Sequence, residues 1–241
     1  MDTQASLEAV LDQALAEHTP DAILATGDLA HEPRPDIYAR FLETIRARSD
    51  AALLCLPGNH DVLAAMEAAE MPMAPLSLPG WDLVPLDSHE DEVTPALITE
   101  EDKAAVAAAI AEARQANLLV ATHHPLVAVN SPWLDKDRIQ NAAELVDWLS
   151  ECSAKLRAIV FGHAHQEVNG VIQGLDVYGV PSTCFQFKPA SESFAIDDAL
   201  PGYRWLFLSP QKDPQTNMHE RGQIETEVRR VDYPINVKLR N

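Results

Sequence analysis

Short apolar runs alternate with stretches of helical periodicity along the first two thirds of the chain. Apolar side chains recur every three or four residues in residues 5–17 and 35–45, and unbroken apolar runs fill residues 22–26 and 51–56. The first spacing predicts amphipathic helices, and short unbroken runs predict buried strands. The chain therefore begins with alternating helices and strands.

The same alternation continues to about residue 165. We expect further strands at residues 81–86, 118–122 and 158–161, and further helices at residues 62–69, 99–115 and 141–153. Thr99 and Asp102 stand three residues apart at the start of one of these helices, a spacing typical of a capping box. Strands that alternate with helices predict a mostly parallel sheet with helices on its faces.

Beyond residue 166 the pattern changes to paired strands. Residues 168–172 and 175–180 flank the turn-forming pair Gln173-Gly174, and residues 203–208 and 224–231 have similar strand character. These pairs predict antiparallel hairpins. Neither a linker-like segment nor an internal repeat divides the chain, so we expect a single domain over residues 1–241.

Polar clusters follow four of the predicted strands directly, and they contain five of the nine histidines. A lone polar residue at a strand end is usually a cap or turn residue, but ligand sites of open α/β sheets form beyond the carboxyl ends of strands. Four clusters in succession therefore favour one shared site. In chain order they are Asp28; Asn59, His60 and Asp61; His123 and His124; and His163 and His165.

The charge of the chain limits its partners. Eighteen Lys and Arg residues stand against thirty-seven Asp and Glu residues, which gives a net charge of −19. Such a charge repels nucleic acids and anionic membranes, so we expect neither as a partner. A phosphate-bearing substrate would need a local positive charge, which a bound cation supplies. Imidazole, carboxylate and amide donors together suit Mn, Fe or Zn.

Cysteine content and the N-terminus favour a cytoplasmic location. Cys55, Cys152 and Cys184 show no paired spacing, which argues against both a disulfide framework and a zinc knuckle. The first residues lack the basic and apolar regions of a signal peptide, and no apolar run is long enough to span a membrane.

Taken together and in this order, the four strand-end motifs resemble the calcineurin-like metallophosphoesterase superfamily. They are Gly-Asp at residues 27–28, Gly-Asn-His-Asp at 58–61, His-His-Pro at 123–125 and Gly-His-x-His at 162–165. Segments 131–135, 181–189 and 201–204 resemble the bacterial class III 3′,5′-cyclic-AMP phosphodiesterases within it. The resemblance implies an α/β fold of four layers, α/β/β/α, with mixed sheets, and hydrolysis of cyclic AMP to 5′-AMP.

The resemblance also implies a site for two divalent metal ions, Fe or Mn foremost and Zn or Mg as alternatives. Asp28 would bridge both ions, and His165 would bind the first. Asn59, His123 and His163 would complete the coordination of the second. A hydroxide held by the metals would then attack phosphorus.

Other residues would assist rather than bind metal. The resemblance implies that His60 is the catalytic residue that contacts the phosphate and helps the ribose 3′-oxygen depart, with Asn59 and His165 also facing the substrate. Asp61 would orient its loop, and His124 would support the ligands from behind. Either Glu32 or His31 would orient His60, unless both are simply exposed to solvent. Trp133, Phe185 and Phe187 either stack on adenine or pack loops against the sheet.

One feature departs from the resembled pattern. The family's first strand ends in Asp-x-His and supplies two ligands of the first metal, whereas this chain enters its first helix almost at once, and Asp2-x-Gln4 is a poor substitute. In the resembled fold that strand lies inside a sheet, so its loss leaves backbone groups without partners. We therefore expect an N-terminally shortened domain that lacks the first strand.

Three interpretations of this departure remain: a shortened form of an ordinary two-metal enzyme, an enzyme that works with one metal, or a catalytically impaired nucleotide-binding homologue. A broader phosphodiesterase or phosphatase on the same site is a further alternative, because peripheral loops set specificity. The partner we expect is a small cyclic nucleotide, and the chain would be a monomer or homodimer.

Overall fold

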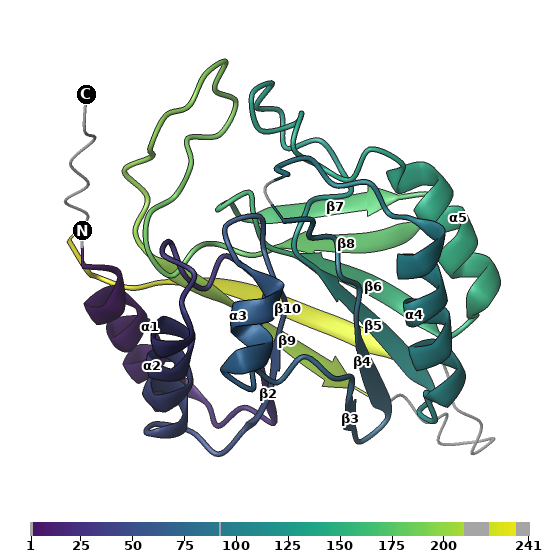
Figure 1. Ribbon diagram of the computed structural model, residues 1–241, viewed down its shortest axis with the longest axis horizontal. Coiled ribbons are helices and arrows are strands. Elements are labelled where there is room, and N and C mark those ends of the chain that lie inside the picture. Colours follow the sequence, from purple (N-terminus) through teal and green to yellow (C-terminus); the bar gives the residue numbers. More distant parts are fainter. Residues whose placement is uncertain (1, 92, 210–221, 235–241) are drawn as a thin grey trace.

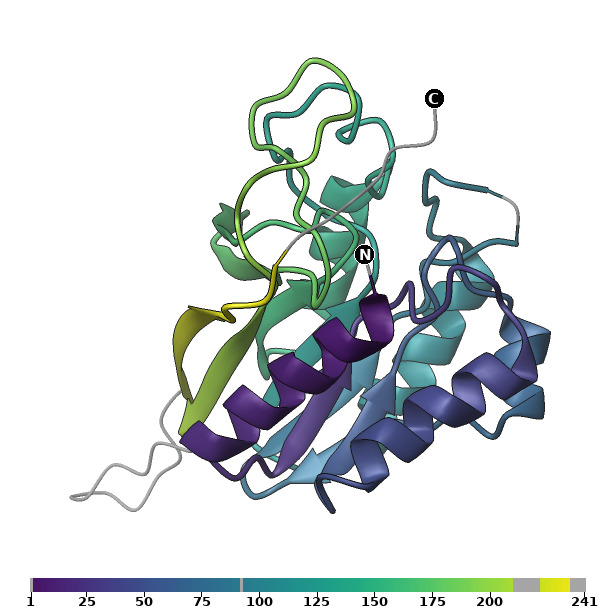
Figure 2. The same ribbon diagram turned by 90° about the vertical axis from the view of Figure 1, so that its left-hand side faces the viewer.

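Two layers of strands, enclosed by two layers of helices, form the architecture in the computed structural model, which describes residues 2–91, 93–209 and 222–234 (Figures 1 and 2). The helices are α1 (Thr3–Glu17), α2 (Pro35–Arg46), α3 (Leu63–Ala68), α4 (Glu100–Glu112) and α5 (Ala142–Cys152). The strands are β1 (Ala22–Ala25), β2 (Ala52–Cys55), β3 (Leu76–Leu78), β4 (Trp81–Pro85), β5 (Asn117–Thr122), β6 (Leu156–Phe161), β7 (Val168–Ile172), β8 (Leu175–Gly179), β9 (Gly202–Ser209) and β10 (Gln223–Arg230).

The larger sheet has six strands in the order β3-β4-β5-β6-β8-β7. Its four central strands run parallel, and β3 and β7 pair antiparallel at the two edges. Every residue of β5 is buried, as expected for a strand covered on both faces. Helices α4 and α5 cover one face, where Val106, Leu145 and Leu149 pack against the sheet.

The second strand layer consists of two separate pairs. Strands β1 and β2 are parallel, and β9 and β10 are antiparallel. Side chains from both pairs, including Leu24 and Leu206, pack with Trp81 and Leu119 of the larger sheet. Helices α1 to α3 lie on the outer side of β1 and β2. The four-layer α/β/β/α prediction is therefore confirmed.

One expectation about the sheet was wrong. The strands before Asp28 and Asn59 belong to the β1-β2 pair, not to one mostly parallel sheet with β5 and β6. Their apolar side chains pack against the larger sheet instead of hydrogen-bonding to it. Among the described residues, β1-β2 and β9-β10 are separate two-stranded pairs.

Local sequence signals account for several element boundaries. Thr99 and Asp102 form the predicted capping box at the start of α4. Gln173 and Gly174 both adopt positive φ angles, 51° and 81°, as the two-residue turn between β7 and β8 requires. Strand β3 was not predicted, because its three residues lie in a Met- and Pro-rich stretch.

Candidate metal centre

The ends of four strands bring four polar side chains together. Asp28 follows β1, Asn59 follows β2, His123 follows β5 and His163 follows β6. His123 Nε2 lies 3.1 Å from His163 Nδ1, 3.2 Å from Asn59 Oδ1 and 3.4 Å from Asp28 Oδ2. His163 Nδ1 lies 2.9 Å from Asn59 Oδ1. The four donor atoms therefore converge on one small volume between the two strand layers.

Two glycines make this convergence possible. A Cβ atom at Gly27 would collide with the ring of His123, and one at Gly58 would collide with the carboxylate of Asp28. Gly27 also has a φ of +98°, a conformation that L-residues rarely adopt. The glycines of the Gly-Asp and Gly-Asn-His-Asp motifs thus allow the backbone to approach the site closely.

Asp61 joins the two loops that carry Asp28 and Asn59. Its carboxylate accepts hydrogen bonds from the backbone nitrogens of Leu29, Ala30 and Gly58 and from the hydroxyl of Tyr38, at 2.9–3.1 Å. The side chain is buried, and burial raises the pKa of Asp61 although these donors act in the opposite direction. Asp61 therefore orients both loops.

Backbone carbonyls select the tautomers of two histidines. His123 Nδ1 lies 2.7 Å from Thr26 O, and His165 Nδ1 lies 2.9 Å from Phe185 O. A carbonyl oxygen can only accept, so each Nδ1 carries the proton and each neutral ring keeps a lone pair on Nε2. At both residues Nε2 is then the atom available to a ligand.

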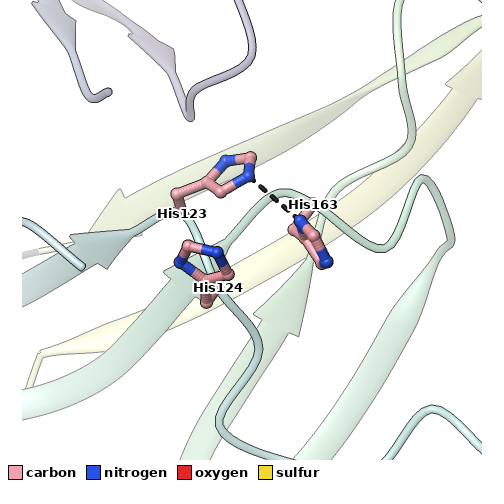
Figure 3. A group of neighbouring side chains, drawn as sticks. All are labelled: His123, His124 and His163. Carbon is pink, nitrogen blue, oxygen red and sulfur yellow. Dashed lines mark hydrogen bonds between the residues drawn. The ribbon is translucent and has the colours of Figure 1, made fainter. Parts of the chain in front are cut away.

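His124 lies next to His123 and His163. The ligand atoms of His123, His124 and His163 all lie within 4.8 Å of one another (Figure 3). His124 Nδ1 is 2.8 Å from the hydroxyl of Ser88, which fixes the ring. The Nε2 atoms of His124 and His163 are buried without a hydrogen-bond partner.

Most of these rings have a lowered pKa, so they are in the neutral form that can bind a metal. Burial, with a further contribution from the neighbouring His123, lowers the pKa of His163 well below its ordinary value and that of His124 to about 3. Burial lowers the pKa of His165 to about 4. Burial opposes the charge of Asp28, but the His123 ring lowers the pKa of that carboxyl strongly. At neutral pH the site therefore offers neutral rings at His163, His124 and His165 and a carboxylate at Asp28, whereas Asp28 raises the pKa of His123 against its burial, so that ring must release its proton to bind a cation.

These residues fit a divalent cation. Two nitrogen and two oxygen donors converge, and buried imidazole atoms lack partners inside the protein. The unpartnered atom of His163 is Nε2, whereas its converging atom is Nδ1, so the fit rests on the four converging donors. The mixed donor set suits Mn, Fe or Zn.

The first-metal side of the predicted site has fewer donors. His165 interacts electrostatically with Asp28, the ligand that both ions would share. Asp2 instead caps α1 through a hydrogen bond from Ala5 N, and Gln4 donates to Thr44. Neither terminal residue therefore supplies the expected Asp-x-His ligands.

The surroundings of His60 differ in part from expectation. His60 is exposed, and its backbone nitrogen donates to Asp28 Oδ1 at 3.0 Å. Glu32 directs its carboxylate at Arg34, 2.7 Å away on the surface, so the structure does not place it as the group that orients His60. The His31 ring is closer to this role, with its centroid 6.0 Å from that of His60.

Sequence reasoning missed the residues that support the site from a distance. Tyr38 lies on α2 and bonds to Asp61, and Ser88 follows β4 and bonds to His124. Ser88 stands at a strand end, so its position carried a signal, whereas Tyr38 looks like an ordinary apolar-face residue of a helix.

Comparisons with known proteins agree with this geometry. Residues 2–167 match the calcineurin-like phosphoesterase family. The chain belongs to this family. Among its calcineurin-like relatives is the 3′,5′-cyclic adenosine monophosphate phosphodiesterase CpdA of Pseudomonas aeruginosa, 35% identical over 96% of this chain and 83% of the relative. The CpdA protein of Vibrio vulnificus is 33% identical over 95% of this chain and 82% of its own length.

Solved structures share the fold. A dimetal phosphatase from Danio rerio gives a TM-score of 0.52 at 15% identity, with 84% of each chain covered. A purple acid phosphatase from yellow lupin gives 0.54 at 12% identity, covering 95% of this chain and 49% of that one. At these identities the likeness concerns the fold alone. Among the described helices, none has the length and apolar character needed to cross a bilayer.

Proposed function

We propose that this chain is a metal-dependent phosphodiesterase that hydrolyses 3′,5′-cyclic AMP to 5′-AMP. The single observation that carries the proposal is the convergence of Asp28, Asn59, His123 and His163 within 2.9–3.4 Å contacts, in a family member similar to CpdA over most of its length.

In this proposal Asp28, Asn59, His123 and His163 hold one divalent ion, and Asp28 and His165 face a second position. A bound cation would neutralise phosphate charge and lower the pKa of a water molecule. It would also attract a phosphodiester into a protein of net charge −19. Fe or Mn is the metal that we propose, and Zn is an alternative that the same imidazole and carboxylate donors allow.

The protein groups would position and protonate the substrate. Asn59 and His165 would contact the phosphate beside the metal. His60 is exposed at the mouth of the site and attached through its backbone to Asp28, so its ring is free to protonate the departing ribose 3′-oxygen. Asp61 and His124 would hold the loops and rings in place.

A substrate panel tests this function. We expect the Mn²⁺-loaded chain to hydrolyse cyclic AMP and bis-p-nitrophenyl phosphate, and to turn over p-nitrophenyl phosphate much more slowly. Products would be separated by chromatography, which distinguishes 5′-AMP from 3′-AMP. A preference for the monoester, or release of 3′-AMP, would contradict the proposal.

We also propose that the enzyme acts on cyclic AMP of the cytoplasm, and that residues 1–241 work as one domain. Cys55, Cys152 and Cys184 are all free thiols, as is usual in reducing compartments. Limited proteolysis of the metal-loaded chain would test the domain proposal, because two units would separate as stable fragments.

A further inference from the structure

A cavity of about 560 Å³ opens beside His165, outside the four converging donors. Its size falls in the range of small-molecule pockets, roughly 300–1,000 Å³. Strand β7 forms one wall, residues 127–130 form a second, and parts of the segment 186–199 form a third. His165 is the residue that belongs both to this cavity and to the candidate site.

His165 is held rigidly at the boundary between them. Its Nδ1 donates to Phe185 O at 2.9 Å, and its ring stacks on Phe187 with centroids 4.4 Å apart and planes 12° apart. Trp133 and Phe194 contact Phe187 edge-on, at 5.1 and 5.6 Å. A phosphate next to His165 would thus have the cavity within reach of its substituents.

The wall formed by residues 186–199 is a built structure. Lys188 N donates to Ala195 O, and Asp197 N donates to Gln186 O, so the segment folds back on itself. The Gln186 side chain is buried and bonds twice to the backbone of Ser182. The cavity is therefore defined by hydrogen-bonded backbone.

The lining combines apolar walls with a polar rim. Val127, Val129, Val168 and Phe187 provide the apolar surface, and Val171, on the opposite face of β7 from Val168, stands at the edge of the cavity with 62% of its side chain exposed. An apolar slot of this kind suits the flat face of a nucleobase. A cyclic nucleotide extends such a base from its phosphate.

The rim carries hydrogen-bonding groups of both kinds. Asp197 offers a carboxylate, and one of its oxygens accepts from Asp198 N at 2.9 Å. Arg230 anchors one guanidinium nitrogen on Leu200 O at 3.0 Å. A carboxylate accepts a hydrogen bond from the exocyclic amine of adenine but repels the carbonyl oxygen that guanine presents at the same position.

We propose that this cavity binds the nucleoside part of the substrate, with the base against Val168 and Phe187, with Val171 at the edge of the opening, and with Asp197 accepting from the exocyclic amine of adenine. The proposal rests on the proposed function and adds to it the residues that select the base. Neither Val171 nor Asp197 is among the metal or catalytic residues.

Filling the cavity tests the first half of the proposal. Val171→Trp places an indole on an exposed position of the edge strand β7. We expect KM and the calorimetric dissociation constant for cyclic AMP, both with Mn²⁺, to rise about tenfold or more, and kcat/KM for bis-p-nitrophenyl phosphate, whose nitrophenyl groups are smaller than a nucleoside, to fall less. The matched control is Leu97→Trp, because Leu97 is 60% exposed and does not line the cavity.

Removing the Asp197 carboxylate tests the proposed selection of adenine over guanine. Asp197→Asn should lower the ratio of kcat/KM for cyclic AMP to that for cyclic GMP about tenfold, and Asp198→Asn, an exposed neighbour outside the cavity, should leave it unchanged. An unchanged ratio in Asp197→Asn, or equal effects of Val171→Trp on both diesters, would overturn the cavity proposal.

The two proposals fail in different ways. If the parent chain hydrolyses cyclic AMP while Val171→Trp binds it as tightly as the parent, only the cavity assignment is wrong. If the parent cleaves bis-p-nitrophenyl phosphate but neither binds nor cleaves a cyclic nucleotide, both proposals are wrong. Calorimetric binding keeps the test decisive even for a chain with slow turnover.

Discussion

The two halves of the candidate site, one around His163 and one around His165, differ in how many donors surround them. In the His163 half, His123 lies 3.1–3.4 Å from His163, Asn59 and Asp28, and His163 lies 2.9 Å from Asn59. In the His165 half, the described residues bring Asp28 and His165 alone. Affinity for a cation depends on donor number and geometry, so the first half should bind far more tightly.

The comparison also shows where rigidity comes from. Both halves orient an imidazole by a backbone carbonyl, Thr26 O for His123 and Phe185 O for His165. Asp61 fixes the loop of Asp28, which both halves share, and it also fixes the loop of Asn59, which belongs to the His163 half. A site needs both oriented rings and fixed loops before it can hold an ion well.

The largest expected effect comes from His163→Ala, which removes a donor from the His163 half. His163→Ala should abolish bound metal and lower kcat/KM for bis-p-nitrophenyl phosphate more than about a thousandfold, because it removes a central donor. His165→Ala should retain one metal equivalent, measured by mass spectrometry of the loaded protein. Equal metal loss in both variants would contradict the distinction between the halves, and His18→Ala serves as the control.

His60→Ala should separate catalysis from metal binding. The ring of His60 is exposed, and only its backbone bonds to Asp28. We expect full metal content and a fall in kcat for cyclic AMP of roughly 10²–10⁴-fold, the usual contribution of a general acid. Loss of metal from this variant would show that His60 is a ligand.

Asp61→Asn should weaken the His163 half indirectly. The amide would direct a donor at backbone nitrogens that now donate to Asp61, which should lower the free energy of unfolding by about 1–3 kcal/mol. Metal affinity should fall with it, whereas Tyr38→Phe, which removes one of the hydrogen bonds, should have a smaller effect on both. Urea denaturation and metal titration measure the two quantities.

The smallest expected effect concerns pH. Burial lowers the pKa of folded His124 to about 3 from an ordinary 6.5, so between these values the unfolded chain binds more protons and stability falls as pH falls. At pH 5.5 the lowered pKa of His124 reduces the free energy of unfolding by about 1 kcal/mol. Burial lowers the pKa of His123, but Asp28 raises it above its ordinary value. His123 therefore adds stability as the pH falls, opposite to His124.

The substitution His124→Gln isolates the contribution of His124 to the pH dependence of stability. In urea denaturation of the metal-free chain, His124→Gln should reduce the loss of stability between pH 7 and pH 5.5 by about 1 kcal/mol. The same loss in variant and parent would show that the buried His124 ring does not titrate as expected.

Sequence patterns predicted most elements because their causes are local. The Thr99–Asp102 capping box and the Gln173-Gly174 turn depend on neighbouring residues, so their outcome was visible in the chain. An apolar run shows that a strand is buried but not which sheet it joins, and for that reason the β1-β2 pair was misplaced.

The site was predictable to the extent that strand ends define it. Asp28, Asn59, His123 and His163 all follow strands, and the structure brings them together. The Tyr38 partner of Asp61 depends on where α2 packs, which no local pattern specifies. Tyr38 of that helix bonds Asp61, and Glu32 pairs with Arg34 near its start.

The position of the four donors has a mechanical consequence. Asp28 and Asn59 stand on the β1-β2 pair, whereas His123 and His163 stand on the six-stranded sheet. An ion held by all four would add a strong cross-link between two sheets that pack through apolar side chains and through polar contacts such as that from His123 to Thr26. Removal of the metal should let the two strand layers unfold more independently. Unfolding should then be less cooperative, and its midpoint should be lower.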